Sequence, residues 1–246
     1  MAKDNSVRLS KLMAQRGLCS RREADQLIAK SWVKVDAQVV CQLGTKVSPK
    51  AEITLTSEAQ KFLNQQVTIV LNKPVGYLSS PSDDDYPLAI QLIHPTNQAP
   101  KDRFKNRFNS SHLKGLAPAG RLDIDSKGLL IFTQNGVLAK HIIGENSSVE
   151  KEYLVKVNGS IDKSKISRLE FGIVLDNRPL KRTKIKQLQP GVLQFVLCEG
   201  RKRQIRRMCE EVNLRVVSLK RVRIGKLRLS SLKEGQWRYL GRKEKV

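Results

Sequence analysis

The chain has 246 residues, and 39% of them are hydrophobic, which is enough to bury the core of one large or two modest globular domains. Its 46 lysines and arginines against 23 acidic residues give a formal net charge of +23, an excess that usually serves a polyanionic partner. No stretch is as long and apolar as a membrane span, and the start lacks the apolar core of a signal peptide. We therefore expect a cytoplasmic protein without membrane contact.

The basic excess is concentrated near the C-terminal end. Residues 181–246 contain 20 basic and 5 acidic side chains, a net charge of +15, and we expect this segment to meet phosphate groups. The four cysteines and three histidines lack the spacing of a metal site. We therefore expect reduced structural thiols, no metal and no cofactor.

The first segment, 7–55, has the pattern of a compact domain in which two short helices are backed by short strands. Leu9 and Leu12 share one helix face, and Ser20 with Glu23 makes a capping box that opens the second helix. Basic side chains cluster around the turn between the helices, where they can grip a backbone phosphate or simply form a solvated face. They are Arg8, Lys11, Arg16, Arg21 and Arg22.

The stretch RLSKLMAQRGLCSRREADQLIAKSWVKVD, residues 8–36, resembles the S4 RNA-binding module, in which paired helices present basic residues to structured RNA. This module accompanies many unrelated activities, so the resemblance implies an RNA partner and no particular reaction. Residues 56–66 are polar and are predicted to form a linker that tethers the module flexibly to a second domain, 67–246.

The second domain opens with a strand at 67–71 that runs into the turn NKPVG, where Lys73 offers a point charge beside Pro74 and Gly76. A long basic loop lies at 96–115, and loops of this length are usually functional or disordered. We expect disorder of this loop in the free protein, with RNA contact as the alternative.

The stretch GRLDIDSKGLLIFTQNG, 120–136, places Asp123 on a loop directly before an apolar strand. A carboxylate held by a rigid strand suits catalysis, although Arg121 with Asp123 also fits a turn stabilised by an ion pair. In the later strand KEYLVKV, Tyr153 faces the same side as Val155, so its ring either packs in the core or lines a pocket.

The stretch RKRQIRRMCEEV, 201–212, has apolar residues at helical spacing, from Ile205 to Val212. Five basic residues in the first turns of this predicted helix oppose its macrodipole, and sequences that break a local rule usually do so for function. Three short strands are expected beyond the helix, at 216–219, 222–224 and 227–229.

Four motifs in fixed order, NKPVG, GRLD, EYLV and GRKRQIRRM, together with the S4 module, resemble the RsuA family of ribosomal RNA pseudouridine synthases across nearly the whole chain. The sequences EKEYLV and RQIRRMC most resemble the RluF-like branch, which modifies large-subunit RNA. The resemblance implies an isomerase that converts one uridine of ribosomal RNA to pseudouridine. It also implies a monomer that acts on ribosomal RNA or on a ribosomal precursor particle.

The implied fold is α+β, with the small S4 domain followed by a catalytic domain whose mixed, largely antiparallel sheet carries the site in a cleft. The family gives Asp123 the catalytic role, as a nucleophile or as a base toward the sugar, and gives Arg206 an ion pair that keeps this carboxylate charged. Tyr153 holds the flipped base, with or without moving a proton through its hydroxyl, and Ile205 is its apolar neighbour. Arg121 is expected to hold the displaced RNA backbone or the loop itself. The other residues expected to bind substrate are Lys73, Arg203, Gln204 and Arg207.

Two rival functions make different demands on the sequence. A non-catalytic S4-type RNA-binding or ribosome-assembly protein would carry an altered GRLD or EYLV motif, and both are intact. An RNA hydrolase that uses Asp123 as a base would normally show a metal cluster or paired histidines, and the sequence has neither pattern.

Overall fold

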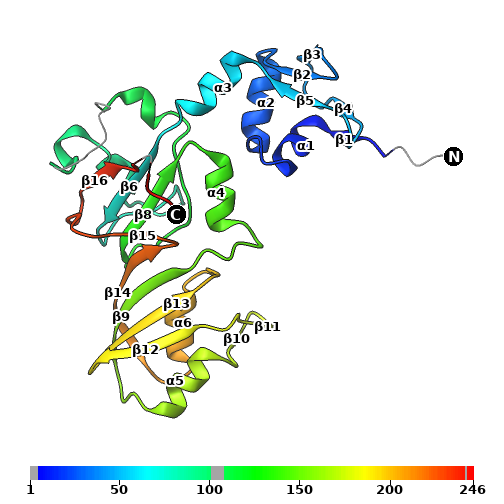
Figure 1. The fold of residues 1–246 in the computed structure, drawn as a ribbon. Coiled ribbons are helices and arrows are strands. Elements are labelled where there is room, and N and C mark those ends of the chain that lie inside the picture. The colour runs from blue at the N-terminus through cyan, green and yellow to red at the C-terminus, as the bar shows by residue number, and fades with distance from the viewer. Residues whose placement is uncertain (1–4, 101–107, 242) are drawn as a thin grey trace.

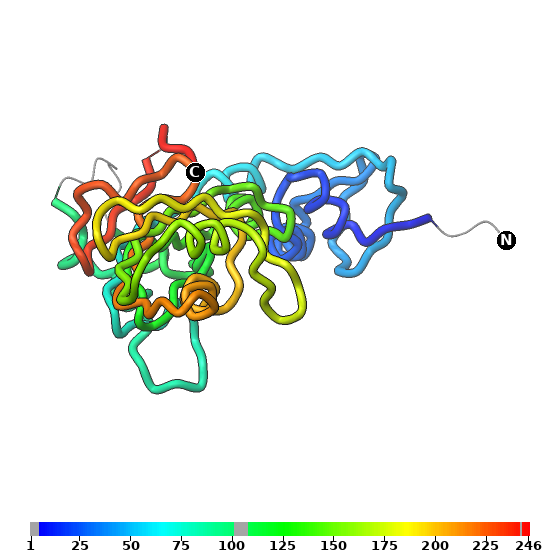
Figure 2. The backbone as a smooth tube through the Cα atoms, turned by 90° about the horizontal axis from the view of Figure 1, so that it is seen from below, coloured from blue at the N-terminus to red at the C-terminus, as the bar shows by residue number. Residues whose placement is uncertain are grey.

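The computed structural model describes residues 5–100, 108–241 and 243–246, and Figures 1 and 2 show a small N-terminal lobe at one end of a larger one. The small lobe contains two helices against short strands. Its elements are β1 (Val7–Arg8), α1 (Leu9–Gln15), α2 (Arg21–Ala29), β2 (Val33–Val35), β3 (Gln38–Val40), β4 (Lys46–Val47) and β5 (Ile53–Leu55).

The local signals predicted for this lobe are confirmed. Ser20 Oγ accepts a hydrogen bond from Glu23 N at 3.2 Å while the Glu23 carboxylate accepts from Ser20 N, which is the capping box that opens α2. The helix faces that carry Leu9 and Leu27 pack on Val33 of β2 in a core of the lobe's own. Burial of this apolar stripe is what holds helices of only seven and nine residues, because such lengths are marginal in isolation.

The segment expected to be a flexible linker contains a helix, α3 (Ser57–Asn64). Thr56 caps it by accepting from Ala59 N at 3.3 Å, and Ala59 is fully buried in the small lobe's core. Its composition is polar because most of its surface faces solvent, and that polarity hid a helix with one narrow apolar face.

The large lobe is built on a nine-stranded sheet in which β14 pairs with β8 in parallel and the other described pairs are antiparallel, so the predicted α+β class with a mixed sheet is confirmed. The strand order is β12-β13-β9-β14-β8-β6-β16, with β15 beside β14 and β7 beside β8. The strands are β6 (Thr68–Lys73), β7 (Ala117–Pro118), β8 (Lys127–Thr133), β9 (Lys151–Asn158), β12 (Lys184–Gln189), β13 (Val192–Leu197), β14 (Arg215–Ile224), β15 (Leu227–Arg228) and β16 (Trp237–Tyr239).

The apolar run of β8 is continuous because this strand is buried on both faces. Leu130 and Phe132 belong to the main core, whereas Leu129 and Ile131 belong to a second core on the opposite face. The predicted strands at 216–219 and 222–224 are a single strand, β14, whose pairing with β9 shifts register twice. These bulges interrupt the side-chain alternation without ending the strand, which is why the sequence reads as two pieces.

Shorter elements surround the sheet. The helices are α4 (Gly136–Ile143), α5 (Lys163–Glu170) and α6 (Gln204–Glu210), the 3-10 turns are η1 (Ala89–Leu92), η2 (Pro95–Asn97) and η3 (Ser110–Leu113), and a hairpin is formed by β10 (Val174–Leu175) and β11 (Arg178–Pro179). None of the helices among the described residues combines the length and the apolar content that crossing a membrane requires.

The basic loop 96–115 is ordered on both sides of residues 101–107, which lie outside the described part of the chain. Ala99 N donates to Trp237 O at 2.8 Å, and the Phe108 ring packs against the Trp237 ring with centroids 5.6 Å apart. The expectation of disorder is therefore wrong for 96–100 and 108–115, because the first flank is hydrogen-bonded to β16 and the second packs an aromatic ring against it.

The two lobes meet where α2 approaches the start of α4. The buried Glu23 carboxylate accepts from Gly136 N at 3.2 Å and from the Gln66 side-chain amide, in addition to capping its own helix. A Cβ added to Gly136 would lie 2.5 Å from the Ser20 hydroxyl oxygen and closer still to its Cβ. Only a glycine permits this approach, so the lobes are in direct contact rather than loosely tethered.

This contact predicts a reversed effect of a substitution that is usually mild. Gly136→Ala at the first turn of a helix would ordinarily be neutral or stabilising. Here we expect it to lower the free energy of unfolding by about 1–3 kcal/mol, the usual cost of overpacking. Urea unfolding measures the loss, and small-angle scattering should report a larger radius as the lobes separate.

The matched control is Ser20→Gly, alone and combined with Gly136→Ala. Removal of the Ser20 side chain makes room for the new methyl group. The double variant should therefore lose less stability than the sum of the losses in the two single variants. Strict additivity would show that the lobes do not touch at this point in solution.

Candidate active site

A cavity of about 410 Å³ opens in the large lobe between the loop that precedes β8, strand β9 and the start of α6. Its wall includes seven of the nine residues expected to form the catalytic and substrate-binding site: Arg121, Asp123, Tyr153, Arg203, Gln204, Ile205 and Arg206. The sequence separation between these groups, from 121 to 206, means that the sheet brings three motifs to one place.

The loop that carries Asp123 is held by its main chain. All five carbonyls from 122 to 126 accept a hydrogen bond, so the backbone that positions the carboxylate is tied at each residue. The donors, in chain order of the acceptors, are Ser79 Oγ (2.8 Å), Ser126 N (3.0 Å), Gly76 N (2.9 Å), Arg206 Nη2 (3.0 Å) and Lys73 Nζ (2.9 Å). The NKPVG turn is thus a support for this loop.

Lys73 lies beneath the loop and does not line the cavity. It is fully buried, and its ammonium donates to the carbonyl oxygens of Pro74 at 2.8 Å and Ser126 at 2.9 Å. Burial lowers the pKa of Lys73 to about 8, although the nearby charges of Asp123 and Asp125 favour the ammonium form. The geometry does not support the expected contact of Lys73 with substrate, because no surface of its side chain is exposed.

Arg206 pairs with Asp125, and this corrects the expected ion pair with Asp123. Its Nη2 lies 3.1 Å from Asp125 Oδ1 and also donates to the Asp125 carbonyl oxygen, while Arg203 Nη1 donates to Asp125 Oδ2 at 3.1 Å. Within the described residues, the Asp123 carboxylate has no hydrogen bond or ion pair and faces the cavity instead. In this loop Asp125 meets the two arginines and Asp123 lines the cavity, and spacing alone does not reveal which carboxylate meets the arginine.

Tyr153 and Ile205 face the cavity from β9 and α6. Tyr153 is 7% exposed, and it belongs to the main core together with Val155 and Val157 on the same face of β9, as the alternation predicts. Both alternatives for the ring therefore hold together, because its body packs in the core while part of it lines the cavity. The Arg221 guanidinium carbon lies 5.9 Å from the centre of the Tyr153 ring.

The helix α6 begins at Gln204, later than the basic stretch suggests. Arg203, in the left-handed region at φ 51°, precedes it, so three of the five basic residues lie outside the helix and the conflict with the macrodipole is smaller than expected. Gln204 is buried, accepts from Arg201 N at 2.9 Å and donates to Glu199 Oε1 at 3.0 Å. Its side chain therefore closes the turn that leads into the helix.

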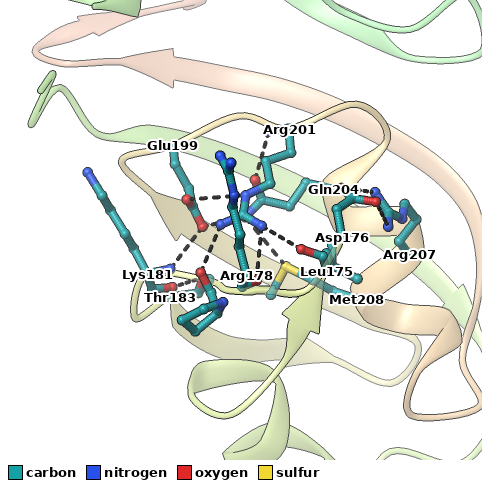
Figure 3. A network of polar contacts seen from close by, with 11 residues as sticks. Leu175, Asp176, Arg178, Lys181, Thr183, Glu199, Arg201, Gln204, Arg207 and Met208 are labelled. Carbon is teal, nitrogen blue, oxygen red and sulfur yellow. Dashed lines mark hydrogen bonds and ion pairs between the residues drawn. The ribbon is translucent and has the colours of Figure 1, made fainter. Parts of the chain in front are cut away.

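Two further arginines of the basic stretch 201–212 hold the hairpin β10–β11 (Figure 3). Arg201 donates to the carbonyl oxygens of Leu175, Arg178 and Pro179 at 2.7–3.0 Å. Arg207, expected to bind substrate, makes a bidentate pair with Asp176 at 2.8 and 3.0 Å and does not line the cavity. The hairpin is therefore fixed to the start of α6.

The basic residues expected to bind RNA in the small lobe are exposed on its surface. Arg16 also holds its own lobe together, because its guanidinium donates to the carbonyl oxygens of Ala51 at 2.7 Å and Pro49 at 2.8 Å. For the others, the described structure gives no ion pair. They are Arg8, Lys11, Arg21 and Arg22.

Several residues around the cavity are not predicted from the sequence. Ser79, Asp125 and Arg221 are the principal ones, because each of them binds the loop or borders its cavity. Asp125 lies two residues after the GRLD motif. The sequence shows only that either Asp123 or Asp125 could pair with an arginine. Ser79 and Arg221 lie 44 residues before and 98 residues after Asp123, and no pattern in the sequence marks them.

The family comparisons agree with this arrangement of residues. The model of the RNA pseudouridylate synthase family matches residues 67–211, and that of the S4 domain matches residues 7–53. The first match covers more than half of the chain and includes every residue that lines the cavity except Leu219. The protein therefore belongs to the RNA pseudouridine synthases, a class of isomerase, and carries an N-terminal S4 RNA-binding domain.

Individual relatives include RluF and other RNA pseudouridine synthases at almost the same identity. The chain is 34% identical over 242 residues to the dual-specificity RNA pseudouridine synthase RluF of Escherichia coli, covering 98% of this chain and 77% of that protein. It is 33% identical to an RNA pseudouridine synthase of Aquifex aeolicus over 97% of this chain and 94% of that one. A crystal structure of a pseudouridylate synthase superimposes with a TM-score of 0.65 at 29% identity, covering 96% of both chains.

The burial of Lys73 predicts a pH dependence of stability. Its pKa in the folded protein, about 8, lies below the ordinary value of 10.5, so the unfolded chain binds more protons between these two values. The free energy of unfolding of the wild type relative to Lys73→Met should therefore rise with pH across this window, by about 1.4 kcal/mol per unit at most.

Urea unfolding of both proteins at several pH values between 7 and 11 gives this difference. Titration of the other groups is common to both and cancels. A difference that stays constant, or that falls as the pH rises, would contradict a buried lysine with a lowered pKa.

Proposed function

We propose that this protein isomerises a specific uridine of ribosomal RNA to pseudouridine with Asp123 as the catalytic carboxylate. The reaction breaks the C1′–N1 bond, turns the uracil and joins C1′ to C5. The C5 proton is lost and N1 gains one, so atoms balance and no oxidant is required. Asp123 acts on the ribose or the base as a nucleophile or a base while the uracil is detached.

The observation that carries the proposal is that Asp123 and Asp125 have different contacts. Asp125 takes both arginine contacts, and Asp123 presents a carboxylate without a partner, among the described residues, to the cavity. Lys73 beneath the loop supplies positive charge near Asp123 without occupying its lone pairs. A nucleophile or base needs this combination of a fixed backbone, a favourable field and free oxygen atoms.

The rest of the cavity suits a flipped pyrimidine. Tyr153 offers an aromatic face, and Leu122, Ile205 and Leu219 add apolar surface around it. A uridine inside a structured RNA must leave its stack to reach a carboxylate, and an aromatic ring restores part of the lost stacking energy. Arg121, exposed at the edge of the cavity, is placed to meet the phosphate of the displaced nucleotide.

The choice of ribosomal RNA rests on the S4 lobe, on the basic charge and on the RluF-like sequence, because all three favour a large structured RNA. RluF itself is named as a dual-specificity enzyme, so other RNA classes belong in the test. Pseudouridine should be mapped in all RNA from cells with and without this protein. Loss of one ribosomal RNA position is expected, and losses confined to other RNA would overturn the choice.

The central prediction concerns Asp123→Asn, which removes the charge and keeps the shape. We expect single-turnover isomerisation to fall by about a thousandfold or more, the scale at which a lost nucleophile or base is felt. The dissociation constant for RNA should change little, since the S4 lobe and the basic surface are unaltered.

Asp125→Asn is the matched control, with the same chemical change two residues along the loop. It weakens the Arg203 and Arg206 contacts and should lower turnover by about tenfold, because the loop is still held by its other main-chain hydrogen bonds. Equal losses in the two variants would mean that Asp123 acts only through the position of the loop.

Tyr153→Phe tests whether the hydroxyl takes part. The ring and most of its stacking remain, so RNA binding should persist, and the described structure gives the hydroxyl no hydrogen bond that the change would remove. We expect a loss on the order of a hundredfold in single-turnover rate, because the hydroxyl helps to remove the C5 proton. A rate near that of the wild type would leave Tyr153 as a stacking surface alone.

A further inference from the structure

A second cavity, of about 370 Å³, adjoins the first on the far side of Arg121 and Tyr153. The two cavities share six wall residues, so a molecule that fills the first has a direct way into the second. Beyond the shared wall, the second cavity is lined by three cationic side chains that the reaction described above does not use: Lys151, Lys181 and Arg221.

Arg221 is the most unusual of the three. It is 2% exposed, its Nε donates to Leu129 O at 2.7 Å and its Nη1 donates to Arg121 O at 3.2 Å, whereas its buried Nη2 has no partner. A buried charged donor without a partner lowers the stability of the folded state. The guanidinium is thus fixed by two carbonyls with one donor edge left for a ligand.

Lys151 stands on β9 and is also buried, with its ammonium donating to a single carbonyl oxygen, that of Val149 at 3.1 Å. Burial lowers its pKa, and the positive charge of Arg221 lowers it further. Among the described residues, no carboxylate forms an ion pair with Lys151 or Arg221. Two buried cations side by side without a counter-charge are unfavourable unless an anion joins them.

The carboxylates of the wall are engaged or exposed. Glu199 accepts from Lys181 N at 2.9 Å and from the Gln204 amide, and it lies 3.9 Å from Arg201 Nε. Figure 3 shows that the Lys181 side chain itself extends away from this network. Glu145 is exposed at the rim. The charge of Lys181 is therefore available at the mouth of the cavity.

We propose that this second cavity is a phosphodiester subsite, in which Arg221 and Lys151 bind the phosphate next to the flipped uridine and Lys181 lies at its mouth. The inference rests on the proposed function, since it places the uracil in the first cavity. A guanidinium edge and an ammonium are the groups that recognise phosphate oxygens, the first with a fixed geometry and the second as a point charge. The backbone of a nucleotide held across Arg121 and Tyr153 would bring a phosphate into the second cavity. The negative charge of this phosphate offsets the repulsion between the two buried cations.

The test uses the full chain and an RNA fragment containing the uridine found by the mapping described above. Single phosphodiesters around that uridine are replaced in turn by uncharged methylphosphonates. In the wild type we expect one adjacent linkage to raise KM by about tenfold with kcat little changed, and more distant linkages to have small effects. In Lys151→Met, KM should already be raised, and the same linkage should add little.

Lys181→Ala keeps the test decisive if Lys151→Met fails to fold, because Lys181 is exposed. It should raise KM and make the slope of log affinity against log salt shallower by about 0.7, the value for one phosphate contact of a single strand. Lys163→Ala, which removes an exposed lysine on α5, is the matched control and should leave the effect of the sensitive linkage intact. Full additivity of the linkage and the lysine variants, or no sensitive linkage at all, would overturn the proposal.

Inorganic phosphate provides an arm that does not depend on the reaction. At constant ionic strength it should raise the unfolding temperature of the wild type more than that of Lys151→Met or Lys181→Ala, because a ligand that binds only the folded chain stabilises it. If the mapping fails, this arm still reports on the subsite. Phosphate stabilisation without any sensitive linkage would assign the cavity to free phosphate and overturn the RNA subsite.

Discussion

The site depends on one short loop whose main chain is fixed from below. All five carbonyls from 122 to 126 have donors, and these come from the NKPVG turn, from Ser79, from α6 and from the loop itself. A carboxylate at the end of a short side chain takes its position from its backbone, so these hydrogen bonds hold Asp123 at the cavity. The sheet, in turn, brings the distant donors together.

Three buried cations share an unusual arrangement around this loop. Lys73, Arg206 and Arg221 are at most 7% exposed, and each donates to main-chain carbonyl oxygens around the loop or its supports. Arg206 and Arg221 also each leave a buried nitrogen without a partner. Burial of such groups works against stability, and its concentration beside the cavity is the pattern expected where a protein is built for an anionic substrate rather than for maximal stability.

The sequence predicts the parts of the fold whose signals are local. The capping box of Ser20 and Glu23, the alternation around Tyr153 and the apolar spacing from Ile205 appear in the structure as expected. Partners that depend on tertiary geometry were not predictable: a lysine charge looks the same in sequence whether it meets solvent or, like Lys73, two carbonyls in the interior. The choice of Asp125 over Asp123 by Arg206 depends on the loop's conformation, which spacing does not encode.

The parallel pairing of β14 with β8 joins the two halves of the sheet through two residue pairs, Lys220 with Lys127 and Arg221 with Gly128. A Cβ on Gly128 would lie 2.8 Å from Arg221 N, so the strands are as close as a glycine allows. Because the cavity needs residues from both halves, it is complete only after β14 has joined the sheet. The small lobe, by contrast, buries a core drawn from residues 9–63 alone. During synthesis on the ribosome, the small RNA-binding lobe is therefore expected to fold well before the catalytic cavity is complete. RNA binding and catalysis would thus arise at different times as the chain grows.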